Sequence, residues 1–102
     1  MSYLEDFSRE EKPVLLQFYA DWCMPCKALS PMIDMIEDRA KGQIIVHRIN
    51  IDTSPEIVAE FEISSVPTMV MLKDGAEVWG FTGLMSPVEL KREIEYAASV
   101  KL

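Results

Sequence analysis

Residues 14 to 19, VLLQFY, form a nearly continuous apolar run, and this run most constrains the fold of the chain. A strand with one face in water alternates apolar and polar residues, whereas a strand buried on both faces is apolar throughout. The run therefore predicts a central strand whose sheet is covered by helices on both faces. Of the 102 residues, 49% are hydrophobic, and we expect one domain, 1–102, around one core.

Four segments carry a helical pattern. The predicted helices span 3–12, 26–41, 55–62 and a last segment that begins at 86–89 and continues to about 97. Pro13 ends the first helix and Gly42 ends the second, in which Pro31 is expected to introduce a kink. Ser86 and Glu89 have the spacing of a capping box at the start of the last helix.

Three further strands are predicted over 43–51, 68–72 and 76–82, and the turn residues Asp74 and Gly75 join the last two as a hairpin. The first two strands are separated by a helix, so they should be parallel with a right-handed crossover. The hairpin strands should be antiparallel. This order predicts a three-layer α/β sandwich.

The charge balance limits the partners of the chain. Seventeen acidic residues outnumber ten basic ones, which gives a formal charge of −7 and argues against nucleic acid and anionic membranes as partners. No apolar run approaches the roughly 18 residues of a membrane span. The first residues, MSYLEDFSREEK, lack the pattern of a signal peptide, so we expect a cytoplasmic protein, or one whose leader has been removed.

The two cysteines carry the clearest chemical signal. Cys23 and Cys26 stand two residues apart, between a predicted strand and a predicted helix. Backbone N–H groups at a helix start favour a thiolate, which lowers the pKa of Cys23, and Lys27 adds a nearby positive charge. Cys26 lies one turn further in and is expected to be less exposed. Two such thiols can exchange with another disulfide: one attacks, and the other resolves the mixed disulfide.

Three other interpretations of this pair stay open at this point. A zinc site would need four ligands, and His47 is the only other typical ligand, so no metal is expected. The cysteines could be inert core residues. They could also form a purely structural disulfide, although so short a loop constrains the unfolded chain little.

The sequence resembles the thioredoxin family over nearly its whole length. The motifs WCMPCK after the buried strand, SVPT at 65–68, NID at 50–52, KDG at 73–75 and TG at 82–83 carry this resemblance. It implies a thioredoxin-like α/β/α sandwich with a mixed sheet. Because the chain begins at the first helix, we expect about four strands, without the first strand of the usual fold, and an exposed sheet edge at 44–51.

The resemblance also implies roles for individual residues. Cys23 would attack, Cys26 would resolve, and Pro67 would follow a cis peptide bond beside them, unless it is a trans proline that only opens a strand. A groove for the client protein would be formed by Trp22, Met24, Pro25, Val66, Pro67, Gly83 and Leu84. The backbone of Val66 would pair with an extended client segment. Trp22 could instead be only a packing residue.

Two residues depart from the family pattern. The motif is C-M-P-C where thioredoxins typically have C-G-P-C, so Met24 adds apolar surface beside the nucleophile. Gln17 stands where a buried aspartate usually accepts the proton of the resolving cysteine. Glutamine cannot titrate, so deprotonation of Cys26 is expected to be slower or to rely on solvent, unless Gln17 only satisfies a polar need of the core.

The function implied is a thiol-disulfide oxidoreductase that reduces protein disulfides and is recharged by a thioredoxin reductase. No bound cofactor is needed, because the dithiol itself carries two electrons. We expect a monomer, although the exposed sheet edge could support a dimer. Two alternatives are a disulfide oxidant or isomerase, and a non-catalytic adaptor with a thioredoxin fold.

Overall fold

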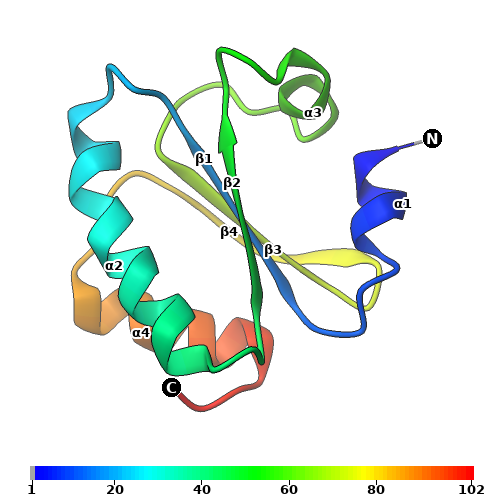
Figure 1. The fold of residues 1–102 in the computed structure, drawn as a ribbon, viewed down its shortest axis with the longest axis vertical. Coiled ribbons are helices and arrows are strands. Elements are labelled where there is room, and N and C mark those ends of the chain that lie inside the picture. The colour runs from blue at the N-terminus through cyan, green and yellow to red at the C-terminus, as the bar shows by residue number, and fades with distance from the viewer. Residues whose placement is uncertain (1) are drawn as a thin grey trace.

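The protein has three layers, a four-stranded sheet between two pairs of helices (Figure 1). The structure is a computed structural model and describes residues 2–102. Helices α2 and α4 lie on one side of the sheet, and α1 and α3 lie on the other. In chain order the elements are α1 (Tyr3–Phe7), β1 (Val14–Tyr19), α2 (Met24–Ala40), β2 (Ile45–Asn50), α3 (Pro55–Glu60), β3 (Thr68–Lys73), β4 (Ala76–Thr82) and α4 (Pro87–Ala98).

The strand order is β2-β1-β3-β4, which confirms the four-stranded mixed sheet and leaves β2 at one edge. Strand β1 pairs in parallel with β2, with Leu16 opposite His47. It pairs antiparallel with β3, and β3 pairs antiparallel with β4 across an irregularity at Met71 and Leu72. The parallel and hairpin pairings are those predicted from the sequence.

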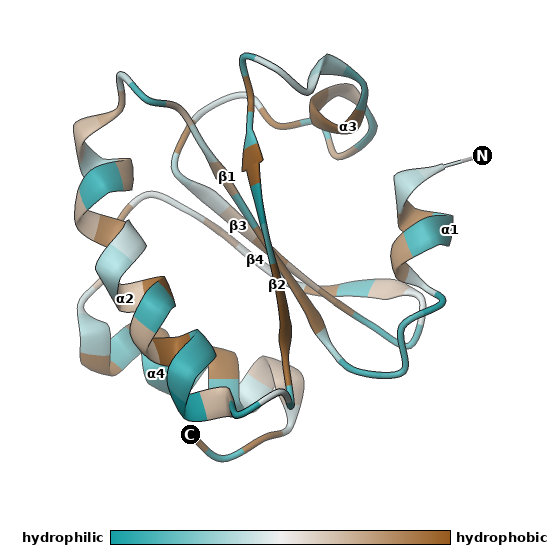
Figure 2. Ribbon diagram, viewed as in Figure 1, coloured by the Kyte–Doolittle hydropathy of each residue, from teal (hydrophilic) through white to brown (hydrophobic). Residues whose placement is uncertain are grey.

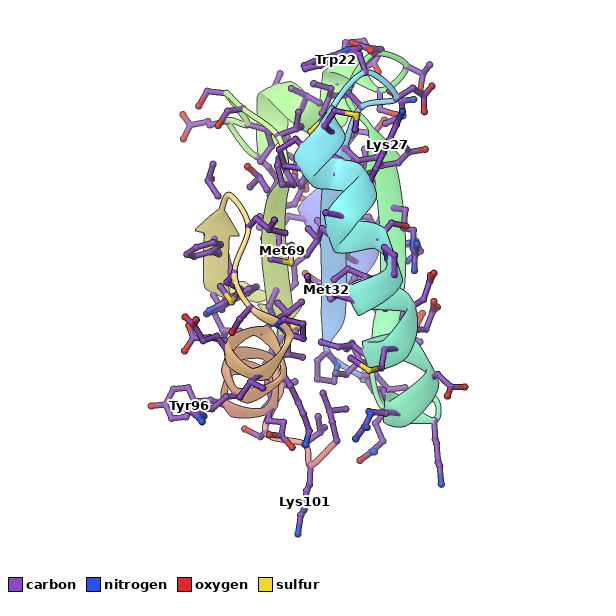
Figure 3. All side chains as sticks on the ribbon, turned by 90° about the vertical axis from the view of Figure 1, so that its left-hand side faces the viewer. Trp22, Lys27, Met32, Met69, Tyr96 and Lys101 are labelled. Carbon is purple, nitrogen blue, oxygen red and sulfur yellow. A yellow bond between two sulfur atoms is a disulfide. The ribbon has the colours of Figure 1, made fainter. Side chains whose placement is uncertain are left out.

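Strand β1 divides the core into two halves, because successive side chains point to opposite faces. Leu15 packs with the apolar residues of α2 and α4, while Leu16 and Phe18 pack with those that face α1 and α3. Both faces are therefore covered, and this explains the continuous apolar run. In Figure 2 the hydrophobic colour runs along the strands. In Figure 3 Met69 lies on the sheet face that carries α2 and α4, whereas Tyr96 projects outward from α4.

Helix α1 is shorter than predicted, and the expected end at residue 12 is wrong. It ends at Phe7, and the hydroxyl of Ser8 donates to the carbonyl of Leu4 at 2.6 Å. Residues 8–12, SREEK, offer the core no apolar side chain. A helix this short depends on packing rather than on propensity, so it ends where its apolar stripe ends.

Helix α1 is attached to the protein by its side chains and by a remote acid. Leu4 and Phe7 pack against the core half that contains Phe18. The carboxylate of Glu60, at the end of α3, accepts hydrogen bonds from the backbone N–H groups of Tyr3 and Leu4, both at 2.8 Å. These N–H groups have no partner within the helix, so Glu60 caps α1 from another element.

Helix α2 begins two residues earlier than predicted, because Cys23 itself is the N-cap. Pro31 lies inside the helix without ending it, and the kink expected there stays a prediction. The helix ends at Ala40, followed by two left-handed residues, Lys41 (φ 49°) and Gly42 (φ 84°). The other boundaries lie within two residues of those predicted.

Helix α4 begins at the predicted capping pair. The hydroxyl of Ser86 accepts from the N–H of Glu89 at 3.2 Å and donates to the Glu89 carboxylate at 3.0 Å. In the usual capping box the glutamate bonds instead to the backbone of the cap residue. Leu90 and Ile94 are fully buried, as their spacing indicated. Across residues 2–102, no helix combines the length and the apolar character that a membrane crossing requires.

Candidate active site

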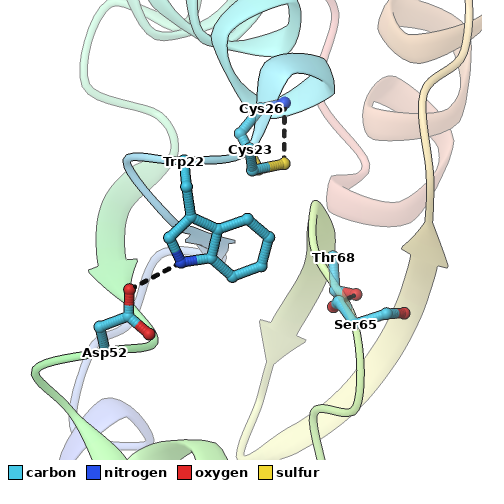
Figure 4. Close-up of a disulfide and its surroundings, with 6 residues drawn as sticks. All are labelled: Trp22, Cys23, Cys26, Asp52, Ser65 and Thr68. Atoms are coloured by element: carbon cyan, nitrogen blue, oxygen red, sulfur yellow. Dashed lines mark hydrogen bonds between the residues drawn. A yellow bond between two sulfur atoms is a disulfide. The ribbon is translucent and has the colours of Figure 1, made fainter.

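The two cysteines form a disulfide at the start of α2, shortly after the end of β1 (Figure 4). Their Cα atoms are 5.3 Å apart. The Sγ atom of Cys23 accepts a hydrogen bond from the backbone N–H of Cys26 at 3.2 Å, in the place of a helix cap. One free N–H group of the helix start, that of Cys26, thus donates to the Cys23 sulfur, and this arrangement favours a thiolate there.

Both cysteines are buried to the same extent in the disulfide form. Their exposed fractions are 4% for Cys23 and 3% for Cys26, so the expected difference in exposure is absent from this form. The closed disulfide holds the two sulfurs together, and Ala20 and Val66 pack against them. The sulfur of Cys23 is therefore covered by neighbouring side chains in the disulfide form and does not lie on an open surface.

Pro67 is buried next to the cysteine cluster, and the Val66–Pro67 peptide bond is cis, as the resemblance implied. The carbonyl of Pro67 accepts a hydrogen bond from the N–H of Gly83 at 2.9 Å. This bond joins the segment after β4 to the segment before β3. It brings Val66, Pro67 and Gly83, which lie far from the cysteines in the sequence, to one end of the sheet.

Thr68 fixes the loop that carries Pro67. Its hydroxyl donates to the carbonyl of Ser65 at 2.7 Å and lies 3.0 Å from the hydroxyl of Thr82 on β4 (Figure 4 shows the first contact). The side chain is 8% exposed. A buried hydroxyl with partners on both sides ties the loop to the sheet.

Trp22 is held in place from outside its own loop. Its ring is 66% exposed, so it does not act as a core packing residue. The indole N–H donates to the carboxylate of Asp52 at 2.9 Å, and the backbone N–H of Asp52 donates to the side chain of Asn50 at 2.9 Å (Figure 4). Asp52 belongs to the NID motif at 50–52, and the sequence alone did not indicate its bond to Trp22.

The remaining groove candidates are exposed apolar side chains. Met24 is 69% exposed and Leu84 45% exposed, and Pro25 is also exposed. These three and Trp22, which we call the apolar rim, are exposed to water, and Trp22, Met24 and Pro25 adjoin the redox cysteines in the sequence. An exposed apolar patch of this kind is typical of a surface that binds another molecule.

A pocket of about 510 Å³ opens beside Cys26. Its lining consists of Gln17, Tyr19, Ala20, Asp21, Cys26, Lys27, Ser30 and Arg48. Gln17 is only 2% exposed, and its side-chain oxygen has no hydrogen-bond partner within residues 2–102. The pocket is large enough for water, and its lining combines polar and charged side chains with apolar surface.

Arg48 borders this pocket, and its contacts with α2 were not predicted from the sequence, which indicated only a role at the sheet edge. It lies opposite Gln17 in the register of β1 and β2, so both side chains point toward α2. Its guanidinium donates to Asp34 and to the hydroxyl of Ser30 (3.1 Å), and lies 3.6 Å from the carboxylate of Glu37. The positive charge of Arg48 is thus paired with acidic residues of α2, while Lys27 lines the same pocket as Cys26.

The geometry also bears on the zinc interpretation. Within the part of the chain that the structure describes, no group of three or more His, Cys, Asp or Glu residues gathers as metal ligands would. His47 lies against Phe7, with ring centroids 5.0 Å apart. Both cysteines are bonded to each other.

A disulfide at a strand-to-helix junction, bordered by a cis proline, defines a thiol-disulfide oxidoreductase. The family model described as Thioredoxin matches residues 1–96. The chain therefore belongs to the thioredoxin family.

Individual relatives agree with this assignment. Thioredoxin from Mycobacterium tuberculosis is 34% identical over 93 residues, which cover 91% of this chain and 80% of that protein. Thioredoxin from Rickettsia felis is 41% identical over 76 residues, 74% of this chain and 72% of that one. The chain spans 20% of the bifunctional thioredoxin reductase/thioredoxin of Mycobacterium leprae, at 34% identity over 91% of its own length.

A solved structure shows the same fold. The oxidised form of mitochondrial thioredoxin 3 from Saccharomyces cerevisiae superimposes with a TM-score of 0.80 at 27% identity. The match covers 89% of this chain and 84% of the yeast chain. This likeness confirms the predicted fold class.

Proposed function

We propose that this protein reduces disulfides in other proteins and is recharged by a thioredoxin reductase in the cytoplasm. The observation that carries the proposal is the placement of Cys23: its sulfur caps α2, and its neighbours Trp22 and Met24 are exposed apolar side chains of the rim. A rim of this kind suits a folded or extended protein client better than a small polar molecule. The M. leprae relative, whose name joins a thioredoxin to its reductase, supports the choice of electron donor.

The reaction exchanges one disulfide for another, so its electrons and bonds balance: the client disulfide is reduced and the Cys23–Cys26 disulfide forms. The thiolate of Cys23 attacks one sulfur of the client disulfide, and the other client sulfur leaves as a thiolate. The thiol of Cys26 loses its proton and attacks Cys23 in the mixed disulfide. The Cys23–Cys26 disulfide forms, and the client is released with two thiols. Two electrons pass from this protein to the client, and no further group is required.

The residues around the pair have separate tasks in this scheme. Val66 offers its backbone to the client segment beside the disulfide, as in strand addition. Trp22 and Leu84 contact the client from either side. Water in the pocket at Gln17 accepts the proton of Cys26, because glutamine itself cannot.

The reduction potential of the Cys23–Cys26 pair tests the direction of electron flow. We expect a value near about −270 mV, as is typical of thioredoxins, by equilibration against a thiol buffer of known poise. A value above about −200 mV would instead favour the oxidant or isomerase alternative and a compartment other than the cytoplasm. If the Cys23–Cys26 disulfide does not form, both enzyme functions are excluded and the non-catalytic adaptor is the remaining alternative.

A trapping experiment tests the division of roles. The Cys26→Ser variant should accumulate a mixed disulfide with a client through Cys23, because the resolving thiol is gone. The matched Cys23→Ser variant should trap no client. If Cys23→Ser traps clients as well as Cys26→Ser, the proposed order of attack is wrong.

A further inference from the structure

The methionines of this chain differ sharply in their access to solvent. The sequence has seven, and six lie within residues 2–102. Met69 and Met71 are 0% exposed, and Met32 and Met85 are partly buried against the core. The remaining two, on α2, are exposed, Met35 at 39% and Met24 at 69%.

Met24 is the most exposed of these six methionines, and it stands between the two redox cysteines. A peroxide oxidises a methionine thioether in one two-electron step: the sulfur gains an oxygen atom, the O–O bond breaks, and water or an alcohol leaves. Because the reaction requires access to the sulfur, a side chain 69% in water reacts before those within the core. The product is a polar sulfoxide in place of an apolar thioether.

The position of Met24 determines what such a change would affect. Its side chain is exposed like those of Trp22 and Leu84, and the proposed function assigns these side chains of the apolar rim to client contact. Cys23 and Cys26 are buried, and the hydrogen bond to the Cys23 sulfur comes from the backbone of Cys26. A sulfoxide at Met24 therefore alters the rim and leaves the capped sulfur unchanged.

We propose that Met24 is an oxidant-sensitive modification site, and that its sulfoxide weakens the docking of protein clients without stopping thiol-disulfide chemistry. This inference rests on the proposed function, because it assumes that the rim receives proteins. Methionine sulfoxide reductases reverse the modification, so the change acts as a switch. Under peroxide stress the protein would retain its disulfide chemistry but lose access to large clients.

Peptide mass spectrometry tests the first half of the proposal. The protein is first fully oxidised to the Cys23–Cys26 disulfide, so that no thiol consumes peroxide, and is then treated with graded hydrogen peroxide. We expect oxygen uptake at Met24 first, at Met35 more slowly, and at Met69 and Met71 last. Equal rates at Met24 and Met35 would overturn the assignment, as would survival of Met24 while buried methionines react.

Paired activity assays test the second half. The peroxide-treated protein is reduced again and assayed with a protein disulfide and with a small aromatic disulfide. We expect the rate on the protein disulfide to fall several-fold, and the rate on the small disulfide to change less than twofold. Incubation with methionine sulfoxide reductase should restore the lost rate.

Two matched variants identify the responsible residue. Met24→Leu keeps an apolar side chain that peroxide does not oxidise, so its rates before and after peroxide should be equal. Met35→Leu, on the same helix but outside the rim, should lose activity as the parent does. If Met24→Leu loses as much as the parent, the inference is wrong. If the untreated protein is inactive on protein disulfides, the proposed function is wrong. The proposed effect of Met24 oxidation on client docking is then wrong as well.

Discussion

At the residue scale, Gln17 distinguishes this site from the usual family pattern. It is buried beside Cys26, and its oxygen is without a hydrogen-bond partner in residues 2–102. An amide at this point cannot accept the proton that Cys26 releases. We therefore expect the proton of Cys26 to leave through water in the neighbouring pocket rather than through an internal base.

Replacing Gln17 with aspartate should restore an internal base. We expect Gln17→Asp to speed the release of a mixed disulfide by about tenfold or more, because a positioned base replaces water. Stopped-flow measurement of the resolving step checks this. Gln17→Asn, which shortens the side chain without adding a base, is the control. An unchanged resolving rate in Gln17→Asp would refute a rate-limiting deprotonation.

The same substitution has a predicted cost in stability. Burial raises the pKa of the new carboxyl, so the folded protein binds its proton more tightly than the unfolded chain does. The loss should be small below about pH 4, grow as the pH rises, and reach about 1–4 kcal/mol at neutral pH. Urea unfolding at several pH values measures it. Gln17→Asn should show a loss that does not vary with pH.

Asp52 positions Trp22, and its removal should affect clients rather than the disulfide. In Asp52→Ala the indole loses its acceptor, so we expect kcat/KM for a protein disulfide to fall about fivefold, corresponding to about 1 kcal/mol. The reduction potential should stay unchanged. Asp52→Asn keeps an oxygen acceptor and should be close to the parent. Equal loss in both variants would mean that the charge, not the hydrogen bond, matters.

The site residues that the sequence predicted are those whose motif is local or shared with the family. Cys23 and Cys26 follow from their spacing, and Pro67 from the resemblance. Arg48 and Asp52 were missed because their partners lie 14 and 30 residues away, respectively, and such pairings appear only once the strands are in register. A short motif does not predict a hydrogen bond to a residue that lies far away in the sequence.

At the scale of the element, α1 depends on a single remote carboxylate. Glu60→Ala removes both acceptors for the N–H groups of Tyr3 and Leu4. We expect a loss of about 1 kcal/mol in the free energy of unfolding, since the site is exposed, and faster hydrogen exchange at these two amides. Denaturant unfolding and exchange measured by NMR check both.

Glu60→Gln is the matched control for this prediction. It retains one acceptor oxygen and loses the charge, so its effect should be smaller than that of Glu60→Ala. If neither variant changes the unfolding free energy or the two exchange rates, Glu60 does not hold α1. The early end of α1 shows why periodicity alone overestimated the length of this helix. Residues 8–12 are compatible with a helix but have no apolar side chain that would pack against the core.

At the scale of the whole molecule, β2 forms one edge of the sheet, as the sequence and the resemblance indicated. His47 and Arg48 are exposed along it. Polar and charged side chains at an edge discourage pairing with another chain, so we expect a monomer. Size-exclusion chromatography with light scattering over a range of concentrations tests this.

A paired substitution tests whether these two residues prevent association. His47→Val with Arg48→Val should shift the protein toward dimers or larger species, because a flat apolar edge is open to pairing. Arg9→Val removes one positive charge away from the sheet and should remain monomeric. If the parent is already dimeric, or the double variant stays monomeric, the edge residues do not have this role.

The central position of β1 and β3 determines the order in which parts of the protein unfold. Each is paired on both sides, and their first five residues are buried, whereas α1 contributes no buried residue. Proteins open in parts, and the best-buried strands exchange their amide hydrogens last. Cys23 follows the end of β1, and Pro67 precedes the start of β3. During a thermal ramp, disulfide-reducing activity should therefore persist after the amides of α1 have exchanged, and disappear only when those of β1 and β3 do.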